Sequence, residues 1–160
     1  MVWLAVAGVG MMFAERFSRR EKGIECLLAL FKKMEIEISH YSLSFPDFIE
    51  KTAKENSLKN PRFLPLCAEK IKAGTDFPIA WKESIEEKPP LLLREEKERL
   101  FEFAAVLSSC DKDGVLKVLS FYEETFKNSL TEAKSAKNKY AKLCVACGVF
   151  AGGVVFMTLI

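Results

Sequence analysis

The charged residues of this chain are confined to its middle, and the two ends carry none. No Asp, Glu, Lys or Arg occurs before Glu15 or after Lys142, and the 24 basic and 22 acidic residues all lie between these two positions. A charged middle is typical of a domain in water, and uncharged apolar ends are typical of segments in lipid. We therefore predict an N-terminal membrane anchor over residues 1–17, a helical domain over 18–142 and a C-terminal transmembrane helix over 143–160.

The C-terminal end has nearly the length of a membrane span. Residues 143–160 are uncharged, and as a helix they would extend about 27 Å, close to the ~30 Å of a bilayer's hydrocarbon core. Lys139 and Lys142 precede this run, and Tyr140 stands where an aromatic residue would meet the membrane surface. The alternative is a helix buried in a protein core, which would rarely end without a polar residue.

The N-terminal end is shorter, since residues 1–14 would extend only about 21 Å as a helix. A cleaved secretion signal would carry basic residues before its apolar stretch, whereas Arg16, Arg19 and Arg20 follow it here. A short anchor, an interfacial segment and a start codon placed too late remain as interpretations. We favour the anchor, because local thinning of the bilayer costs little.

Both apolar ends have their basic flank on the side of the central domain. The positive-inside rule then predicts a cytoplasmic domain with both termini across the membrane. Gly148 and Gly152 form a Gly-x-x-x-Gly pattern, which would let another helix approach closely. Packing of the two ends against each other, or of two copies of the chain as a homo-oligomer, is a hypothesis from this pattern.

The central domain shows helical periodicity and no convincing strands. One long pattern follows the N-terminal end and another precedes the C-terminal one, with apolar residues at Ile24, Leu27, Leu28, Phe31, Met34 and Ile38 and at Val115, Leu119, Tyr122, Phe126, Leu130, Ala133 and Tyr140. Shorter helices are predicted to begin at Ser44, Pro61, Asp76 and Leu91, with Gly74 ending the second of these and Ser109 the last. The fold class is therefore all-α, an antiparallel up-down bundle of about six helices with Trp81 and Phe103 in its core.

No pattern in the chain indicates an enzyme or a cofactor site. Phosphate-binding, dinucleotide-binding and hydrolase motifs are missing from the sequence, and His40 is the only histidine. Glu95, Glu96, Glu98 and Glu102 alternate with basic residues, which is typical of a solvated helix face. Asp111 begins a Asp-Lys-Asp-Gly run that is too poor in ligands for calcium and fits a helix cap better. The five scattered cysteines suit a reducing compartment, and a net charge of +2 gives no reason to expect nucleic acid.

The order of several short motifs resembles the stage III sporulation protein AB family of endospore-forming bacteria, which is related to the cytoplasmic F domain of type II secretion and type IV pilus platforms. The similar positions are Glu37-Ile38, Tyr41, Phe45-Pro46-Asp47, Ala80-Trp81 with Ser84-Ile85, Leu107 to Asp111, Lys139-Tyr140, Gly148 and Gly152. Ala104 and Ser108 depart from the family's usual glycines, and Val115 departs from its usual Gln. A partner that binds the segment from Ala104 to Val115 would therefore meet a different surface in this chain.

The resemblance implies a six-helix F-type bundle and a non-enzymatic role as a membrane platform or scaffold. Family members belong to the channel complex between mother cell and forespore, so we expect the mother-cell membrane around the forespore as the location. By analogy with secretion platforms, the bundle would dock a secretion-type ATPase, the stage III sporulation protein AA, beside other channel subunits. A platform protein of a pilus or secretion system outside sporulation is one alternative. A membrane pore or transport subunit is another, disfavoured because neither apolar end carries an ionisable residue.

Overall fold

The computed structural model describes the backbone of residues 2–41, 44–55 and 60–159, and side chains within 18–40, 44–55, 60–111 and 114–140. Over these ranges the chain forms six helices and no strands. In chain order they are α1 Val2–Tyr41, α2 Phe45–Lys54, α3 Leu64–Lys72, α4 Phe77–Glu87, α5 Arg94–Ser109 and α6 Lys112–Leu159. The predicted all-α class, with two long helices and four short ones between them, is confirmed.

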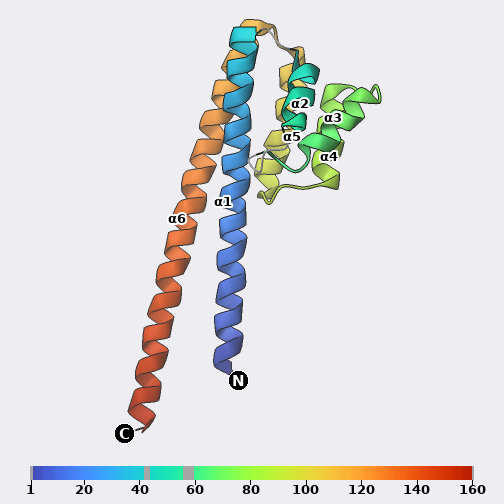
Figure 1. The fold of residues 1–160 in the computed structure, drawn as a ribbon. Helices are drawn as coiled ribbons and strands as arrows, with labels where there is room; N and C mark the ends of the chain where they lie inside the picture. The colour runs from blue at the N-terminus through green and yellow to red at the C-terminus, as the bar shows by residue number, and fades with distance from the viewer. Residues whose placement is uncertain (1, 42–43, 56–59, 160) are drawn as a thin grey trace.

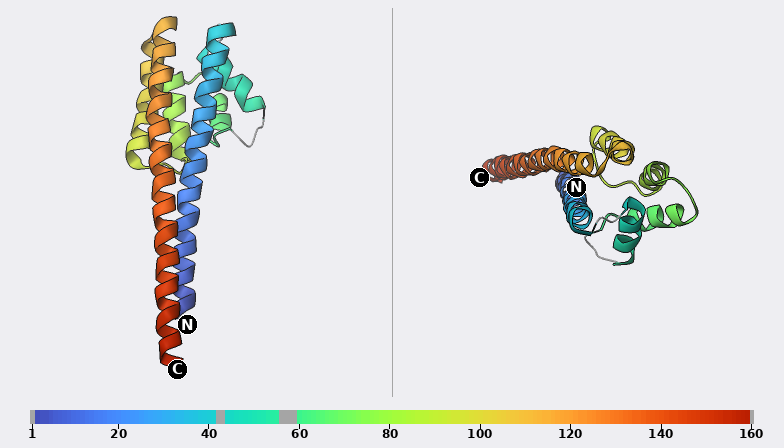
Figure 2. Two further views of the ribbon diagram at one scale, coloured as in Figure 1. Left: turned by 90° about the vertical axis from the view of Figure 1, so that its left-hand side faces the viewer. Right: turned by 90° about the horizontal axis from the view of Figure 1, so that it is seen from above.

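The two long helices run antiparallel to each other along most of their length and form a stalk (Figure 1). Both chain termini lie at the free end of this stalk. Helices α2 to α5 pack beside the other end, where the contacts run from α2 to α3, α4, α5 and finally α6. Seen along the stalk, the short helices form an arc that starts at α1 and returns to α6 (Figure 2). The molecule is therefore a compact head on a long two-helix stalk.

Aromatic side chains fill the core of the head. Trp81 and Phe103 are completely buried, as predicted, and their ring centroids lie 5.8 Å apart. Phe31 of α1 lies 4.8 Å from Phe103, and Tyr122 of α6 lies 5.1 Å from it. The indole N–H of Trp81 donates a 2.9 Å hydrogen bond to the carbonyl oxygen of Leu100, so the polar atom of the ring is satisfied. Phe103 of α5 thus joins three other helices, α1, α4 and α6.

The long apolar patterns identify the buried faces of α1 and α6, with one exception. Tyr140, which continues the α6 pattern, is 49% exposed. Burial on this face ends at Ala133 within the described part of α6. The prediction that Tyr140 belongs to the core is wrong, because the head ends above it and only α1 remains beside α6 (Figure 1).

Local sequence signals set the ends of the short helices. Ser44 caps α2, its Oγ accepting a hydrogen bond from the backbone N–H of Asp47 at 3.4 Å. Gly74 follows α3 with φ of +93°, a conformation that glycine adopts without a steric penalty. Both predictions are confirmed. The helices expected to begin at Pro61 and Leu91 begin three residues later, at Leu64 and Arg94.

The acidic face of α5 is not entirely solvated. Glu96 is only 3% exposed, and its carboxylate accepts hydrogen bonds from Arg20 Nη2 at 2.6 Å and Arg20 Nε at 3.3 Å. It also accepts one from the backbone N–H of Leu93 at 2.8 Å. The prediction of a solvated face is wrong at this residue, because a cation from the distant α1 neutralises it in the interior.

At the lower edge of the head, α1 and α6 are joined by ion pairs. Lys137 lies 2.8 Å from Glu21, and Lys134 lies 3.4 Å from Glu25. The predicted anchor over 1–17 and transmembrane helix over 143–160 lie outside the residues with described side chains. Among the residues that could be assessed, no helix combines the length and the apolar character that a membrane crossing requires. The two membrane segments stay a prediction.

Candidate partner-binding surface

An open groove lies on the head where three segments meet. It encloses about 550 Å³ between the start of α2, the start of α4 and the end of α5. Its walls are Phe45, Pro46, Asp76, Phe77, Pro78, Ile79, Leu107, Ser108 and Cys110. Residues of two motifs that resemble the sporulation family, Phe45-Pro46 and Leu107–Asp111, thus line the groove. The start of α4, the helix that carries the Ala80-Trp81 motif, lines it as well.

Local chain geometry builds the walls of this groove. Pro46 and Pro78 each occupy the first turn of a helix, where proline's fixed φ and missing N–H suit the backbone. The preceding residues, Phe45 and Phe77, stack with ring centroids 5.8 Å apart and planes 14° from parallel. Two similar helix starts therefore face each other across one aromatic contact, and the prolines stiffen the rim on both sides.

A second depression continues the surface on the other side of Pro78 and Ile79. It encloses about 480 Å³ and is also lined by Lys82, Glu83, Glu86, Phe101 and Ala105. Ile79, which both depressions share, is 51% exposed. We call the two depressions together the α4 surface. Its centre is an unburied isoleucine, and apolar side chains flanked by charges are typical of protein interfaces.

Among the residues that line the groove, the one charged side chain is acidic. Asp76 lines it, and Asp47 and Asp111 each follow a lining residue in the chain. All three are exposed. Asp111 Oδ1 accepts a 3.0 Å hydrogen bond from the backbone N–H of Gly114 at the start of α6, which fits the predicted helix cap. This rim would complement a partner with basic side chains around an apolar centre.

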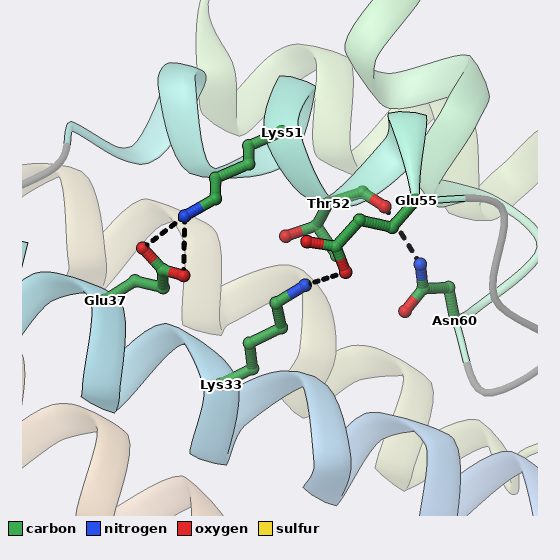
Figure 3. Close-up of polar contacts among 6 residues, drawn as sticks. All are labelled: Lys33, Glu37, Lys51, Thr52, Glu55 and Asn60. Atoms are coloured by element: carbon green, nitrogen blue, oxygen red, sulfur yellow. Dashed lines mark hydrogen bonds and ion pairs between the residues drawn. The ribbon is translucent and has the colours of Figure 1, made fainter.

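Two of the candidate residues, Glu37 and Trp81, hold the head together and are not open to a partner. Glu37 is tied to α2 by Lys51, whose Nζ lies 2.7 and 2.8 Å from its two carboxylate oxygens (Figure 3). The ion pair between Lys33 and Glu55 links the same two helices, and Asn60 donates to the carbonyl of Thr52 at 2.9 Å (Figure 3). Trp81 belongs to the core, as described above. Both motifs therefore shape the head without being open to a partner.

The remaining predicted residues fall into three groups. Leu107 is completely buried and lines the groove, and Asp111 follows the lining residue Cys110 in the chain. Lys139 and Tyr140 are exposed on the stalk, far along α6 from the groove. Gly148 and Gly152 lie on α6 beyond the described side chains. The structure therefore places Leu107 in the groove and leaves Lys139 and Tyr140 apart from it.

Ile79 is the residue of this surface that sequence reasoning missed. Its signal was available in the helical register of α4, since Phe77, Ala80, Trp81 and Ser84 define the buried face and Ile79 falls outside it. A bulky aliphatic residue at an exposed position next to Pro78 is the feature that marks the surface.

The described cysteines show no arrangement suited to nucleophilic catalysis or metal binding. Cys26, Cys67 and Cys110 are free thiols, and burial raises the pKa of the Cys67 thiol to about 12. A thiol that stays protonated is a poor nucleophile and a poor metal ligand. No group of residues that could hold a metal ion occurs among the described side chains.

Comparison with known proteins agrees with this architecture. A solved structure described as stage III sporulation protein AB superposes with a TM-score of 0.66 at 20% sequence identity, covering 76% of this chain and 98% of that one. At this identity the likeness shows the fold. No curated protein matches the chain. The family model for stage III sporulation protein AB matches residues 1–160, and the chain therefore belongs to the stage III sporulation protein AB family.

Proposed function

We propose that the protein is a non-enzymatic membrane platform of the sporulation channel complex, and that its head docks a secretion-type ATPase. Family membership supports a part in the channel between mother cell and forespore. The location would be the mother-cell membrane around the forespore, with the head in the cytoplasm. Other channel subunits would assemble beside it, and chemistry would belong to the ATPase.

The arrangement of the two uncharged ends carries the proposal. They belong to α1 and α6, which run side by side, so both ends lie at the same end of the stalk (Figure 1). Two apolar helix ends at one pole would enter one membrane from one side, and the flanking basic residues favour the cytoplasm for the rest. The head would then lie on the cytoplasmic side, joined to the membrane by the two long helices.

The α4 surface is the best candidate for the docking site. It lies on the head, and its apolar centre, flanking charges and stiff proline-bearing walls suit a folded partner. Ser108, which departs from the family's usual glycine, lines the groove, whereas Ala104, the other departure on α5, is completely buried. The ATPase that binds this chain would carry a matching difference.

Co-purification of the full chain in mild detergent with its ATPase tests this role. We expect capture of the ATPase by the wild type and at least a tenfold loss with Ile79→Asp, because the charge would enter the apolar centre of the contact. Phe121→Asp is the matched control, since Phe121 is 64% exposed and lies outside the α4 surface. Equal capture by both variants would reject the α4 surface, and no capture by folded wild type would reject ATPase docking.

A further inference from the structure

The loop between α4 and α5 carries leucines that the head does not bury. Leu91 and Leu93 are 48% and 50% exposed. Lys88 and Arg94 flank them and are also exposed, with Glu95 beyond and Glu98 paired to Arg94 at 2.9 Å. We call residues 88–93 the leucine loop. Exposed leucines with cations on either side are typical of segments that meet the surface of a membrane.

The leucine loop is held in one conformation. Pro89 and Pro90 restrict its backbone, and the backbone N–H of Leu92 bonds to the carbonyl of Pro90 at 2.8 Å. Leu92 packs against the core. The buried Glu96 carboxylate accepts the N–H of Leu93 and both hydrogen bonds from Arg20. The exposure of its two leucines is therefore a fixed feature of the head, and little conformational entropy would be lost when a partner covers them.

The same contacts fix the height of the loop along the stalk. A Cβ on Gly23 of α1 would lie 3.6 Å from the carbonyl oxygen of Leu91, so the loop rests against α1 at this residue. In two views the loop forms the edge of the head that faces the termini (Figures 1 and 2). The node of Arg20, Glu96 and Leu93 thus couples the loop to one of the two helices proposed to enter the membrane.

This height is close to the expected membrane surface. Gly23 follows Phe17, the last residue of the proposed anchor, by six positions, or about 9 Å of helix. The headgroup layer adds roughly 5–8 Å to each side of the hydrocarbon core. The backbone of the loop would therefore lie at the outer boundary of the headgroups, and exposed side chains on it would need only a few ångströms to enter them.

We propose that the leucine loop lies in the lipid headgroup layer and sets the distance and tilt of the head relative to the membrane. The inference rests on the membrane anchoring proposed above. Leu91 and Leu93 would enter the boundary between headgroups and acyl chains, and Lys88 would face anionic lipid phosphates. Two anchored helices and one loop would then give the head three points of support, so that the α4 surface would be presented to the ATPase in a defined orientation.

Fluorescence quenching by lipids tests the contact. The full chain with Trp3→Phe is reconstituted into vesicles of phosphatidylcholine and phosphatidylglycerol, some carrying a nitroxide on the headgroup. Trp81, completely buried, supplies the reference emission. We expect quenching of Leu91→Trp to exceed that of Ile79→Trp at least twofold. Ile79 is the matched control because it is 51% exposed and belongs to the groove at the opposite end of α4. Leu93→Trp provides a second reporter.

The outcomes separate this inference from the proposed function. Equal quenching at positions 91, 93 and 79, with the protein retained in the vesicles after an alkaline carbonate wash, would overturn the loop contact and leave the anchoring intact. Loss of the protein from the vesicles in that wash would overturn the anchoring and the loop contact together. Quenching at 91 and 93 that disappears when the ATPase is added would show a protein partner to be the occupant and would also overturn the proposal.

Discussion

The head and the stalk of this protein are held together by different interactions. In the head, aromatic rings from α1, α4, α5 and α6 interlock around Phe103. Where the stalk leaves the head, α1 and α6 are joined by exposed or half-buried ion pairs such as Lys134 with Glu25. Burial of aromatic surface stabilises far more than an ion pair in water. We infer that the head sets the stability of the fold and that the stalk acts as a spacer.

The largest effect is expected at the centre of the head. Trp81→Ala should lower the free energy of unfolding by about 3–5 kcal/mol, because it leaves a large cavity and removes the hydrogen bond from the indole to Leu100. Urea unfolding of the full chain in detergent, followed by circular dichroism, measures the change. Phe121→Ala on the exposed face of α6 should stay within about 0.5 kcal/mol. Similar losses in both variants would show that aromatic packing is not what holds the head.

A smaller effect is expected where the head meets the stalk. Glu96→Gln should cost about 2 kcal/mol, because the Arg20 guanidinium, with a side chain only 12% exposed, would lose its counter-charge. Glu98→Gln is the matched control, since its partner Arg94 is 91% exposed, and it should cost at most about 0.5 kcal/mol. The same urea unfolding applies. Equal losses of unfolding free energy in Glu96→Gln and Glu98→Gln would show that the Arg20–Glu96 pair does not stabilise the contact between head and stalk.

The buried thiol of α3 predicts a dependence on alkaline pH. The pKa of Cys67 is raised from 9.0 to about 12 by burial, so the folded state resists an ionisation that the unfolded chain undergoes. The contribution of Cys67 to stability is complete below pH 9 and declines as the pH rises toward 12. By pH 10 it should have fallen by about 1.4 kcal/mol. Comparing urea unfolding of wild type and Cys67→Ala at pH 8 and pH 10 isolates this loss; a constant difference would contradict it.

Sequence patterns were sufficient to predict the helices and most of the core, because 3.6-residue periodicity depends on neighbours along one helix. Phe31, Trp81, Phe103 and Phe126 were all expected and are all buried. Burial that depends on tertiary placement could not be read from the same patterns. Glu96 looks solvated until α1 brings Arg20 to it, and Tyr140 keeps the apolar register although no short helix reaches it.

The candidate site shows the same difference between what local sequence predicts and what depends on tertiary placement. Individual motifs such as Phe45-Pro46 and Leu107–Asp111 were visible in the sequence, but their meeting in one groove depends on the arc of short helices. Ile79 was missed because a single exposed isoleucine has no pattern of its own. Periodicity could have identified it only as the residue that does not fit the buried face of α4.

The smallest effect is expected within the stalk. Lys137→Ala removes the 2.8 Å contact with Glu21, in which the lysine side chain is 42% exposed and the glutamate 17%. Water and salt screen such a pair, so the loss should be about 0.5 kcal/mol at low ionic strength and smaller at 0.5 M salt. Urea unfolding at both salt concentrations measures this difference, with Lys127→Ala as control because its partner Glu123 lies on α6 itself. A salt-independent loss above about 2 kcal/mol would mean that the two long helices depend on this contact, and the stalk could then no longer be regarded as a passive spacer.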